Sequence, residues 1–273
     1  MTSISRAAVL VFSWAACGSA CAAPPEVVPL PNAHAHNDYL HTRPLLDALD
    51  YGFTSVEADI SPIDGNLLVG HEPSALKPER TLETLYLAPL AERVQKNGGQ
   101  VFPNSKRFYL LIDFKGDPQK TYRLLAPLLQ KYSAMLTVVE NGTLKPGAVT
   151  VVLTGNRPKL DPADAAPRYA ALDGRLSDID SKSPPTLMPM ISDAWSANFH
   201  WQGVGHIPAS DRAKLRDYVK RAHAGGRVIR FWATPENEEV WREMRAAGVD
   251  LINTDQLGRL ATFLSTPAAP KQP

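Results

Sequence analysis

The chain has 273 residues, of which 44% are hydrophobic and 21% are charged, and its formal net charge is +1 at pH 7. A chain of this length and composition can bury a full hydrophobic core as one domain. The near balance of acidic and basic residues argues against a nucleic-acid partner.

The amino-terminal segment has the pattern of a secretory signal peptide over residues 1–22. Arg6 precedes an apolar run that ends in the small residues Ala20 and Ala22. The run is too short to cross a bilayer, so we expect no transmembrane segment and an exported protein, periplasmic or secreted. Anchoring as a lipoprotein through Cys17 or Cys21 is the alternative. Cleavage after Ala22 would remove both cysteines, and with them any disulfide framework, and would leave 28 residues of each charge.

From residue 32 onward, apolar strand-like runs alternate with helix-like runs. Strands are expected at residues 32–36, 54–60, 107–115, 148–155, 168–173, 187–193, 227–234 and 251–255. Helices are expected at residues 42–52, 81–97, 117–133, 210–226 and 236–250, and hairpins at residues 66–72 and 135–147. Eight strands separated by helical segments predict a (β/α)₈ TIM barrel, formed as a single domain by residues 23–265.

A doubly wound open sheet would use the same alternation of strands and helices. No glycine-rich dinucleotide fingerprint follows the first strand, so the barrel is favoured. Residues 266–273 are rich in proline and alanine and are expected to form a flexible tail. In a TIM barrel the working residues lie at the carboxy-terminal ends of the strands. The polar residues that end the predicted strands are His36, Glu57, Asp59, Asp113, Lys115, Asn156, Asp193, Asn253 and Asp255.

Two carboxylates lie two residues apart in the second predicted strand. Glu57 and Asp59 therefore point to the same face. Such a pair repels itself unless a proton or a cation lies between the two groups. Oxygen ligands suit a hard ion, so the pair predicts a Mg²⁺ or Ca²⁺ site. His36 precedes the pair and His71 follows it, which places two imidazoles beside the predicted ion.

The third predicted strand repeats this spacing with Asp113 and Lys115. Asp113 would supply a third carboxylate to the ion, and Lys115 would meet a bound anion beside it. A buried ion pair between these two residues is the structural alternative. Three carboxylates, one metal, one lysine and two histidines together suit the cleavage of a phosphodiester.

The order of these motifs resembles the PLC-like phosphodiesterase superfamily. The motifs are His-Asn-Asp at residues 36–38, Glu-x-Asp, a histidine 12 residues after that aspartate, and Asp-x-Lys. The segments HNDY, RPLLDAL, SVEADI, LLVGHE and INTDQL look most like the branch named altered inheritance of mitochondria protein 6. The resemblance spans about His34 to Leu257 and is weak between residues 141 and 205.

The resemblance implies His36 and His71 as the acid–base pair, with Lys115 as a phosphate contact. It implies Glu57, Asp59 and Asp113 as ligands of one Mg²⁺ or Ca²⁺. It also matches Trp232 to a tryptophan at the barrel mouth, where it would pack or stack on substrate. Asn37 and Asp38 would orient His36 or contact the substrate. The expected substrate is a small-molecule or lipid phosphodiester, such as a glycerophosphodiester.

The chain departs from the glycerophosphodiester phosphodiesterase pattern at three places. His36 is followed by Asn37 and Asp38, where those enzymes have His-Arg-Gly, and the downstream Glu-Asn-Thr of those enzymes has no match here. The third acid is an aspartate, Asp113, rather than a glutamate, and this feature leans toward the venom-type phospholipase D branch of the superfamily.

Two other readings use the same residues. His34-x-His36, with Asp255 at the last strand, resembles the zinc-binding start of amidohydrolases and PHP phosphoesterases, although no histidine ends the fourth, fifth or sixth strand. A barrel that binds a phosphate or a glycan without catalysis is the third reading. His34 shares a strand face with His36 and would hold a metal ligand in place.

Overall fold

The computed structural model describes residues 27–105, 107–161 and 166–266. The predicted signal peptide at residues 1–22, with its two cysteines, lies outside the described residues. So does the predicted tail beyond residue 266. No helix in the described part of the chain is both long and apolar enough to span a membrane.

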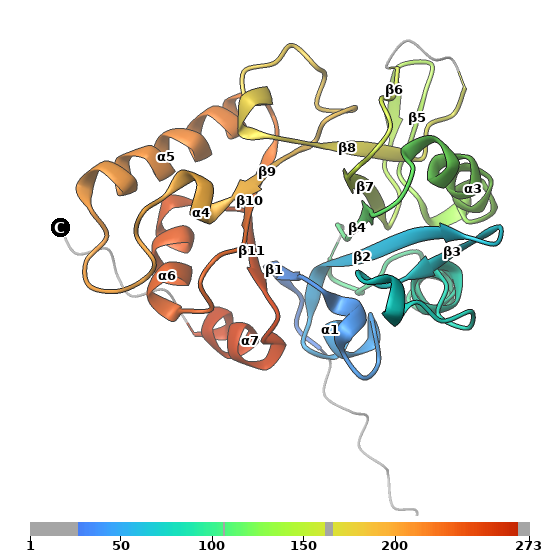
Figure 1. Ribbon diagram of the computed structural model, residues 1–273, viewed down its shortest axis with the longest axis horizontal. Helices are drawn as coiled ribbons and strands as arrows, with labels where there is room; N and C mark the ends of the chain where they lie inside the picture. Colours follow the sequence, from blue (N-terminus) through green and yellow to red (C-terminus); the bar gives the residue numbers. More distant parts are fainter. Residues whose placement is uncertain (1–26, 106, 162–165, 267–273) are drawn as a thin grey trace, which may run out of the picture.

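Eight parallel strands close into a barrel. The closure is made by β1, which pairs in parallel with β2 on one side and with β11 on the other. The strands are β1 (Leu30–Ala35), β2 (Phe53–Ile63), β4 (Tyr109–Phe114), β7 (Thr150–Gly155), β8 (Ala170–Gly174), β9 (Met190–Ala194), β10 (Val228–Trp232) and β11 (Leu251–Thr254). The predicted TIM barrel and its eight strands are confirmed (Figure 1).

The helices lie outside the barrel. They are α1 (Leu46–Asp50), α2 (Ala88–Lys96), α3 (Pro118–Lys131), α4 (Trp195–Asn198), α5 (Ala209–Ala224), α6 (Glu238–Ala247) and α7 (Leu257–Ser265). The five predicted helices are present, and α4 and α7 were not predicted. Among the described residues, no α-helix connects β7 to β8 or β8 to β9, where loops and the short 3₁₀ turn Leu176–Asp178 replace it.

Two hairpins extend the barrel. In one, β3 (Asn66–Val69) pairs antiparallel with the end of β2, and this pairing carries the chain back toward the carboxy-terminal mouth. In the other, β5 (Val138–Glu140) pairs with β6 (Thr143–Lys145). Both hairpins were predicted. The first one determines where His71 lies, because only Gly70 separates that residue from β3.

The helices pack on the barrel through apolar faces. In α6, Val240, Trp241 and Met244 are fully buried, at the spacing of one helical face. Trp195 after β9 packs on Phe199 and Phe231, with ring centroids 4.2 and 5.8 Å away. This packing fixes the positions of the strands, and the strands in turn fix the side chains inside the barrel.

The barrel interior changes from apolar to polar along the strands. Tyr109, Leu111, Val152, Met190 and Leu251 form an apolar cluster of their own near the amino-terminal ends. The next inward-facing positions along the strands are polar and buried: His34, Ser55, Glu57, Thr154, Asp173, Ser192, Arg230 and Asn253. Alternation along each strand produces this layering, since every second residue points inward. The apolar layer closes the bottom of the barrel and the polar layers lead to its mouth.

Candidate active site

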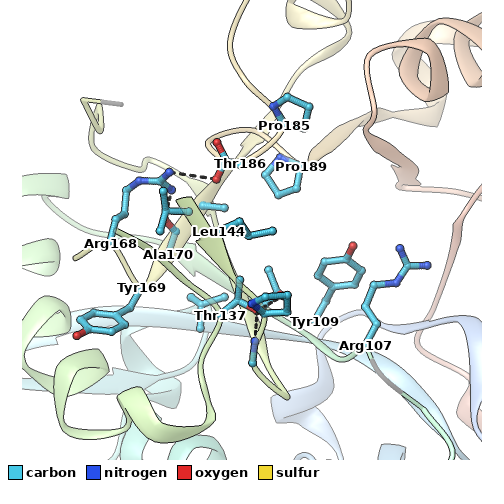
Figure 2. Close-up of a pocket in the computed structure, with 16 residues that line it drawn as sticks. Arg107, Tyr109, Thr137, Leu144, Arg168, Tyr169, Ala170, Pro185, Thr186 and Pro189 are labelled. Carbon is cyan, nitrogen blue, oxygen red and sulfur yellow. Dashed lines mark hydrogen bonds between the residues drawn. The ribbon is translucent and has the colours of Figure 1, made fainter. Parts of the chain in front are cut away.

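A small cavity lies at the amino-terminal ends of β4, β7 and β8, next to the β5–β6 hairpin (Figure 2). Its volume is about 240 Å³. The guanidinium of Arg168 donates there to the backbone carbonyls of Ala170 and Thr186, at 2.7 and 3.1 Å. None of the described residues that line it is a histidine, an aspartate or a glutamate. Among the described residues it therefore offers no histidine or carboxylate as a metal ligand.

A larger cavity of about 880 Å³ lies at the carboxy-terminal ends of the strands. Eight of the nine predicted site residues line it: His36, Asn37, Glu57, Asp59, His71, Asp113, Lys115 and Trp232. Asp38 does not. Among the lining residues that were not predicted are Tyr39, Leu40, Glu72, Arg175 and Arg230. The position agrees with the rule that barrel enzymes work at this face.

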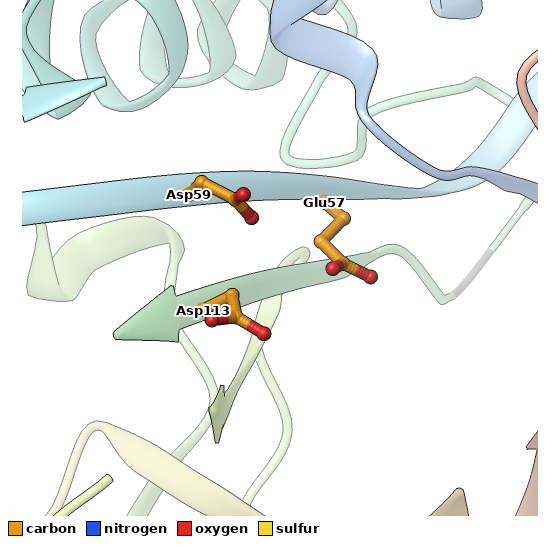
Figure 3. A group of neighbouring side chains, drawn as sticks. All are labelled: Glu57, Asp59 and Asp113. Atoms are coloured by element: carbon orange, nitrogen blue, oxygen red, sulfur yellow. The ribbon is translucent and has the colours of Figure 1, made fainter. Parts of the chain in front are cut away.

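The three predicted carboxylates form one cluster (Figure 3). Glu57, Asp59 and Asp113 each offer an oxygen within 4.8 Å of the others. The strand register explains this proximity, because Asp59 of β2 and Asp113 of β4 are direct neighbours in the parallel ladder. Glu57 lies two residues earlier on the same face of β2. Among the described residues, this is the only group of three or more metal-binding side chains with such spacing.

Lys115 joins two of these acids. Its ammonium lies 3.1 Å from Asp59 Oδ2 and 3.1 Å from Asp113 Oδ1. Although burial lowers the pKa of Lys115, the two carboxylates outweigh that effect and raise it, so the side chain is a cation. Burial and the Glu57 charge raise the pKa of Asp59 to about 6, against the opposing effect of Lys115. The lysine thus partly neutralises a crowded acidic cluster.

Glu57 is held from below by groups in the barrel interior. Arg230 Nη1 donates to Glu57 Oε2 at 2.6 Å, and His34 Nε2 lies 3.2 Å from the same oxygen. Burial raises the pKa of Glu57, but the Arg230 guanidinium outweighs it and holds the pKa well below its usual range. His34 Nδ1 bonds Ser55 Oγ at 2.7 Å. Both ring nitrogens of His34 therefore make hydrogen bonds, and the Arg230 cation lies beside the ring. This arrangement disfavours the interpretation that His34 and His36 bind zinc.

These contacts fit a divalent ion. Arg230 and His34 occupy one oxygen of Glu57, and Asp59 Oδ1 is buried without a hydrogen-bond partner among the described residues. Three carboxylates face two cations, Lys115 and Arg230, so the cluster keeps one excess negative charge. An all-oxygen donor set with excess negative charge suits Mg²⁺ or Ca²⁺.

His36 is oriented by a carboxylate from the opposite end of the chain. Its Nδ1 lies 2.9 Å from Asp255 Oδ1 and 2.9 Å from Asn37 Nδ2. Because a carboxylate only accepts, Nδ1 carries the proton, and Nε2 has no hydrogen bond to the described residues. Burial lowers the pKa of His36, but the bond to Asp255 and the charge of Glu57 outweigh it and raise the pKa.

His71 has a similar arrangement on the other wall. Its Nδ1 lies 2.7 Å from Glu72 Oε1, and its side chain is 56% exposed. The backbone N–H of Gly70 donates to Asp59 O at 3.0 Å, which ties this loop to β2. Each predicted catalytic histidine therefore has a carboxylate on Nδ1, which leaves Nε2 for proton transfer. Their catalytic roles remain predictions.

Asp38 was predicted to orient His36 or to contact the substrate, and the structure contradicts the substrate contact. Its side chain is fully buried and points away from the cavity, where Oδ2 accepts from Leu45 N–H at 2.5 Å and from Tyr86 Oη at 2.9 Å. The reason is local, because Asn37 adopts a left-handed conformation (φ 46°). This turn aims successive side chains in different directions. Asn37 stays at the cavity, and its amide group lies between His36 and Asp255.

Two arginines on the cavity wall were missed. Arg230 is two residues before Trp232 in β10, so strand alternation places both on the inner face, and that signal was available. Arg175 follows β8 and pairs with the buried Asp173 at 2.8 Å. Trp232 ends β10 and is 37% exposed at the mouth, as its predicted place required.

A family model described as the AIM6-like phosphodiesterase domain matches residues 23–163, which is more than half of the chain. The chain belongs to this family. A second model, the glycerophosphoryl diester phosphodiesterase family, matches residues 228–258, around Arg230 and Trp232. The altered inheritance of mitochondria protein 6 homologue of Arthroderma benhamiae is 32% identical, over 85% of this chain and 82% of its own length. The protein of that name from Eremothecium gossypii is 32% identical, over 87% of this chain and 70% of its own length.

These relatives correct one prediction. We expected an exported protein, periplasmic or secreted, from the amino-terminal pattern. The relatives that match most of the chain are fungal proteins named for the inheritance of mitochondria. That finding contradicts a periplasmic or secreted location, and the prediction is wrong.

The solved structures agree with the family in fold. A glycerophosphodiester phosphodiesterase from Parabacteroides distasonis covers 87% of this chain with a TM-score of 0.50 and 14% sequence identity, and the match covers 98% of that structure. At this identity the likeness shows the fold alone. The member of the AIM6-like family described here therefore has a phosphodiesterase-type TIM barrel, with its acidic cluster at the end of the barrel where such enzymes work.

Proposed function

We propose that this chain is a metal-dependent phosphodiesterase whose substrate is a glycerophosphodiester-like or phospholipid-like molecule. One observation carries the proposal: the cluster of Glu57, Asp59 and Asp113 lies in one cavity with Lys115 and with two carboxylate-bonded histidines. Anion-binding, cation-binding and proton-transferring groups are thus gathered where a phosphodiester would need all three.

The acidic cluster would hold one Mg²⁺ or Ca²⁺. A bound ion of this kind polarises the phosphoryl group and takes up charge on its non-bridging oxygens. Lys115 lies beside the cluster and donates to a further phosphate oxygen. Arg230 stays below, paired to Glu57 in the barrel, and keeps that carboxylate ionised. Lys115 therefore contacts the substrate, whereas Arg230 supports a ligand.

His36 and His71 would transfer the protons. One imidazole removes the proton of the attacking hydroxyl, and the other, as imidazolium, protonates the leaving alkoxide. The attacking oxygen belongs to water or to a neighbouring hydroxyl of the substrate, so the product is a phosphomonoester or a cyclic phosphodiester. Asp255 and Glu72 hold the two Nδ1 protons, so both transfers use Nε2.

The rim of the cavity would receive the organic part of the substrate. Leu40 is 71% exposed and Trp232 37% exposed, and both line the cavity. Apolar and aromatic surface beside a phosphate site suits an alcohol or acyl substituent. No arginine follows His36, so the chain lacks the contact that the glycerophosphodiester phosphodiesterase pattern places there.

The proposal is tested by turnover of bis(p-nitrophenyl) phosphate with Mg²⁺, Ca²⁺ or Zn²⁺ added, and with EDTA. We expect Mg²⁺- or Ca²⁺-dependent turnover that EDTA abolishes, with a bell-shaped pH profile. His36→Ala and Glu57→Ala should each lower kcat at least 100-fold. His223→Ala is the matched control, because His223 also bonds an aspartate, Asp250, but lies outside the cavity. Folded protein that binds Mg²⁺ without turnover would favour a binding barrel, and turnover with zinc alone would favour an amidohydrolase.

A further inference from the structure

The connection between β1 and α1 carries His36 and Asn37, and its backbone is strained at two points. Asn37 has φ 46° and ψ 34°, and Leu45 has φ 63° and ψ −52°. At Leu45 the N–H of Leu46 donates to Pro44 O at 2.7 Å, which closes a γ-turn. Asparagine tolerates positive φ, but leucine rarely adopts it, and such a conformation costs about 1–3 kcal/mol. Surrounding contacts must hold this turn.

The carboxylate of Asp38 is the contact that holds it. Asp38 Oδ2 accepts from the Leu45 N–H at 2.5 Å, and so closes the segment on itself. The same oxygen accepts from Tyr86 Oη at 2.9 Å. Tyr86 is fully buried in the π-helical turn Glu83–Leu87, so the segment is fastened to an element that packs on the barrel. π-Helical turns often occur near functional sites.

Asp38 is fully buried, and no cation contacts it among the described residues. Burial raises the pKa of Asp38 to about 7, with its two donors opposing the shift. Its other oxygen, Oδ1, has no hydrogen-bond partner in the described structure. Burying a carboxyl group that has only two neutral donors costs free energy, and an apolar side chain would fill the same space without that cost. We therefore look for its role in the turn that its hydrogen bond to Leu45 closes.

The residues on either side of Asp38 connect its buried carboxylate to His36 and to the acidic cluster. Asn37 Nδ2 donates at 3.3 Å to both oxygens of Asp255, the partner of His36, and Tyr39 Oη lies 2.7 Å from Asn37 Oδ1. Tyr39 Oη also lies 2.9 Å from Asp59 Oδ2, so its single proton is available to either of these two acceptors. A shift of the backbone at Asp38 would therefore move Asn37 and the His36 ring, whereas Glu57 and Asp113 are fixed by strands.

We propose that Asp38 is a positioning residue, whose buried carboxylate locks the strained segment 36–45 and thereby holds His36 against Asp255. The part of this inference that concerns turnover rests on the proposed function. The part that concerns the orientation of His36 does not, because that orientation is a property of the folded protein.

The test compares Asp38→Ala, Asp38→Asn and Tyr86→Phe with the full-length protein. Three experiments are made: NMR of the ¹H–¹⁵N imidazole signal of His36, calorimetry for the Kd of Mg²⁺, and kinetics for kcat and KM with bis(p-nitrophenyl) phosphate. Asp50→Ala is the matched control, since Asp50 is an exposed acid in α1, the helix that follows this connection.

In Asp38→Ala we expect the downfield Nδ1–H signal of His36, which reports its bond to Asp255, to be lost. We expect kcat to fall 10- to 100-fold with KM and the Mg²⁺ Kd within about twofold of wild type, because misplacing a catalytic group by about 1 Å has that effect. In Asp38→Asn the amide oxygen can accept both hydrogen bonds, so most of kcat should return. Tyr86→Phe should fall between the two.

The inference would be overturned if folded Asp38→Ala kept the His36 signal unchanged. If the alanine variant does not fold, an unchanged signal in Tyr86→Phe would overturn it instead. A parallel loss of kcat and Mg²⁺ affinity would also overturn it, because that pattern indicates a general loosening of the site. If the wild-type protein turns over no phosphodiester, the proposed function fails, and the NMR signal still decides the role of Asp38.

Discussion

Gly155 at the end of β7 is the residue whose replacement should damage the acidic cluster most selectively. A Cβ added there would lie 2.2 Å from Asp113 Oδ1 and 2.9 Å from the backbone nitrogen of Phe114. Tight contacts relax at about 3.4 Å, so the Asp113 carboxylate would have to move by about 1.2 Å. The backbone of Gly155 also has φ +68°, which adds about 1–2 kcal/mol of strain for alanine. Gly155→Ala should therefore displace a predicted metal ligand.

The chain provides a control that separates strain from displacement. Gly65 has φ +79°, and a Cβ there would meet nothing within 4 Å. In Gly65→Ala the strain alone should lower the free energy of unfolding, by about 1–2 kcal/mol, and the Mg²⁺ affinity should be unchanged. Gly155→Ala should lose about 1–3 kcal/mol more, as overpacked sites do.

Urea denaturation in EDTA measures the two losses of stability, and calorimetry measures the Mg²⁺ Kd, which we expect to rise 10- to 100-fold in Gly155→Ala only. Equal stability and equal Mg²⁺ affinity in the two variants would refute the reasoning, since Asp113 would then have adapted without cost.

Two further predictions concern buried charges. Arg230→Met leaves Glu57 without its cation in the barrel, where both side chains are almost fully buried, and should lower the free energy of unfolding in EDTA by about 3–5 kcal/mol. Mg²⁺ should restore part of this stability; a loss below about 1 kcal/mol, measured by urea denaturation, would contradict the assigned pairing. For Asp38, the folded-state pKa of about 7 lies above the unfolded value of 3.8, so the native state holds a proton that the unfolded chain releases between these values. The stabilisation that protonated Asp38 contributes is thus present at low pH and is lost as pH rises from about 4 to 7. The free energy of unfolding should fall by up to about 1.4 kcal/mol per pH unit over this range. The stability of wild type relative to Asp38→Asn should fall between pH 4.5 and pH 6.5, and an equal difference at both pH values would show that Asp38 does not titrate there.

Strand alternation was sufficient to predict the acidic cluster. Because β2 and β4 are regular, Glu57 shares a face with Asp59, and Asp113 shares one with Lys115, and the parallel register then brings the two pairs together. The same rule indicates that Arg230 points inward beside Trp232. Its partner was not predictable, since Glu57 lies 173 residues away and meets Arg230 only when the barrel closes.

The orientation of the Asp38 side chain could not be predicted from the sequence. HNDY places three polar residues in a row, and nothing in that row distinguishes the side chain that faces the cavity from the one that faces the core. The distinction comes from a left-handed residue, Asn37, and from a γ-turn at Leu45, and the carboxylate of Asp38 contacts both Leu45 and Tyr86 from another element. Helix α7 is a different case. Leu257, Leu260 and Leu264 have helical spacing, and that signal was present but not used.

The two cations of the site differ in a way that bears on how it would work. Arg230 is 3% exposed and bound to the deepest acid, Glu57, whereas Lys115 is 24% exposed and bridges the two outer acids. Removing Arg230 from its partner would strand a buried carboxylate, so that pair stays intact. Lys115 can leave its partners at little cost once a divalent cation neutralises Asp59 and Asp113. Its ammonium then becomes available to an anionic substrate at the mouth. On the proposed function, the ion and the phosphodiester would therefore bind in a favoured order, since Lys115 pairs with the acids in the structure and would pair with the phosphate only after the ion has bound.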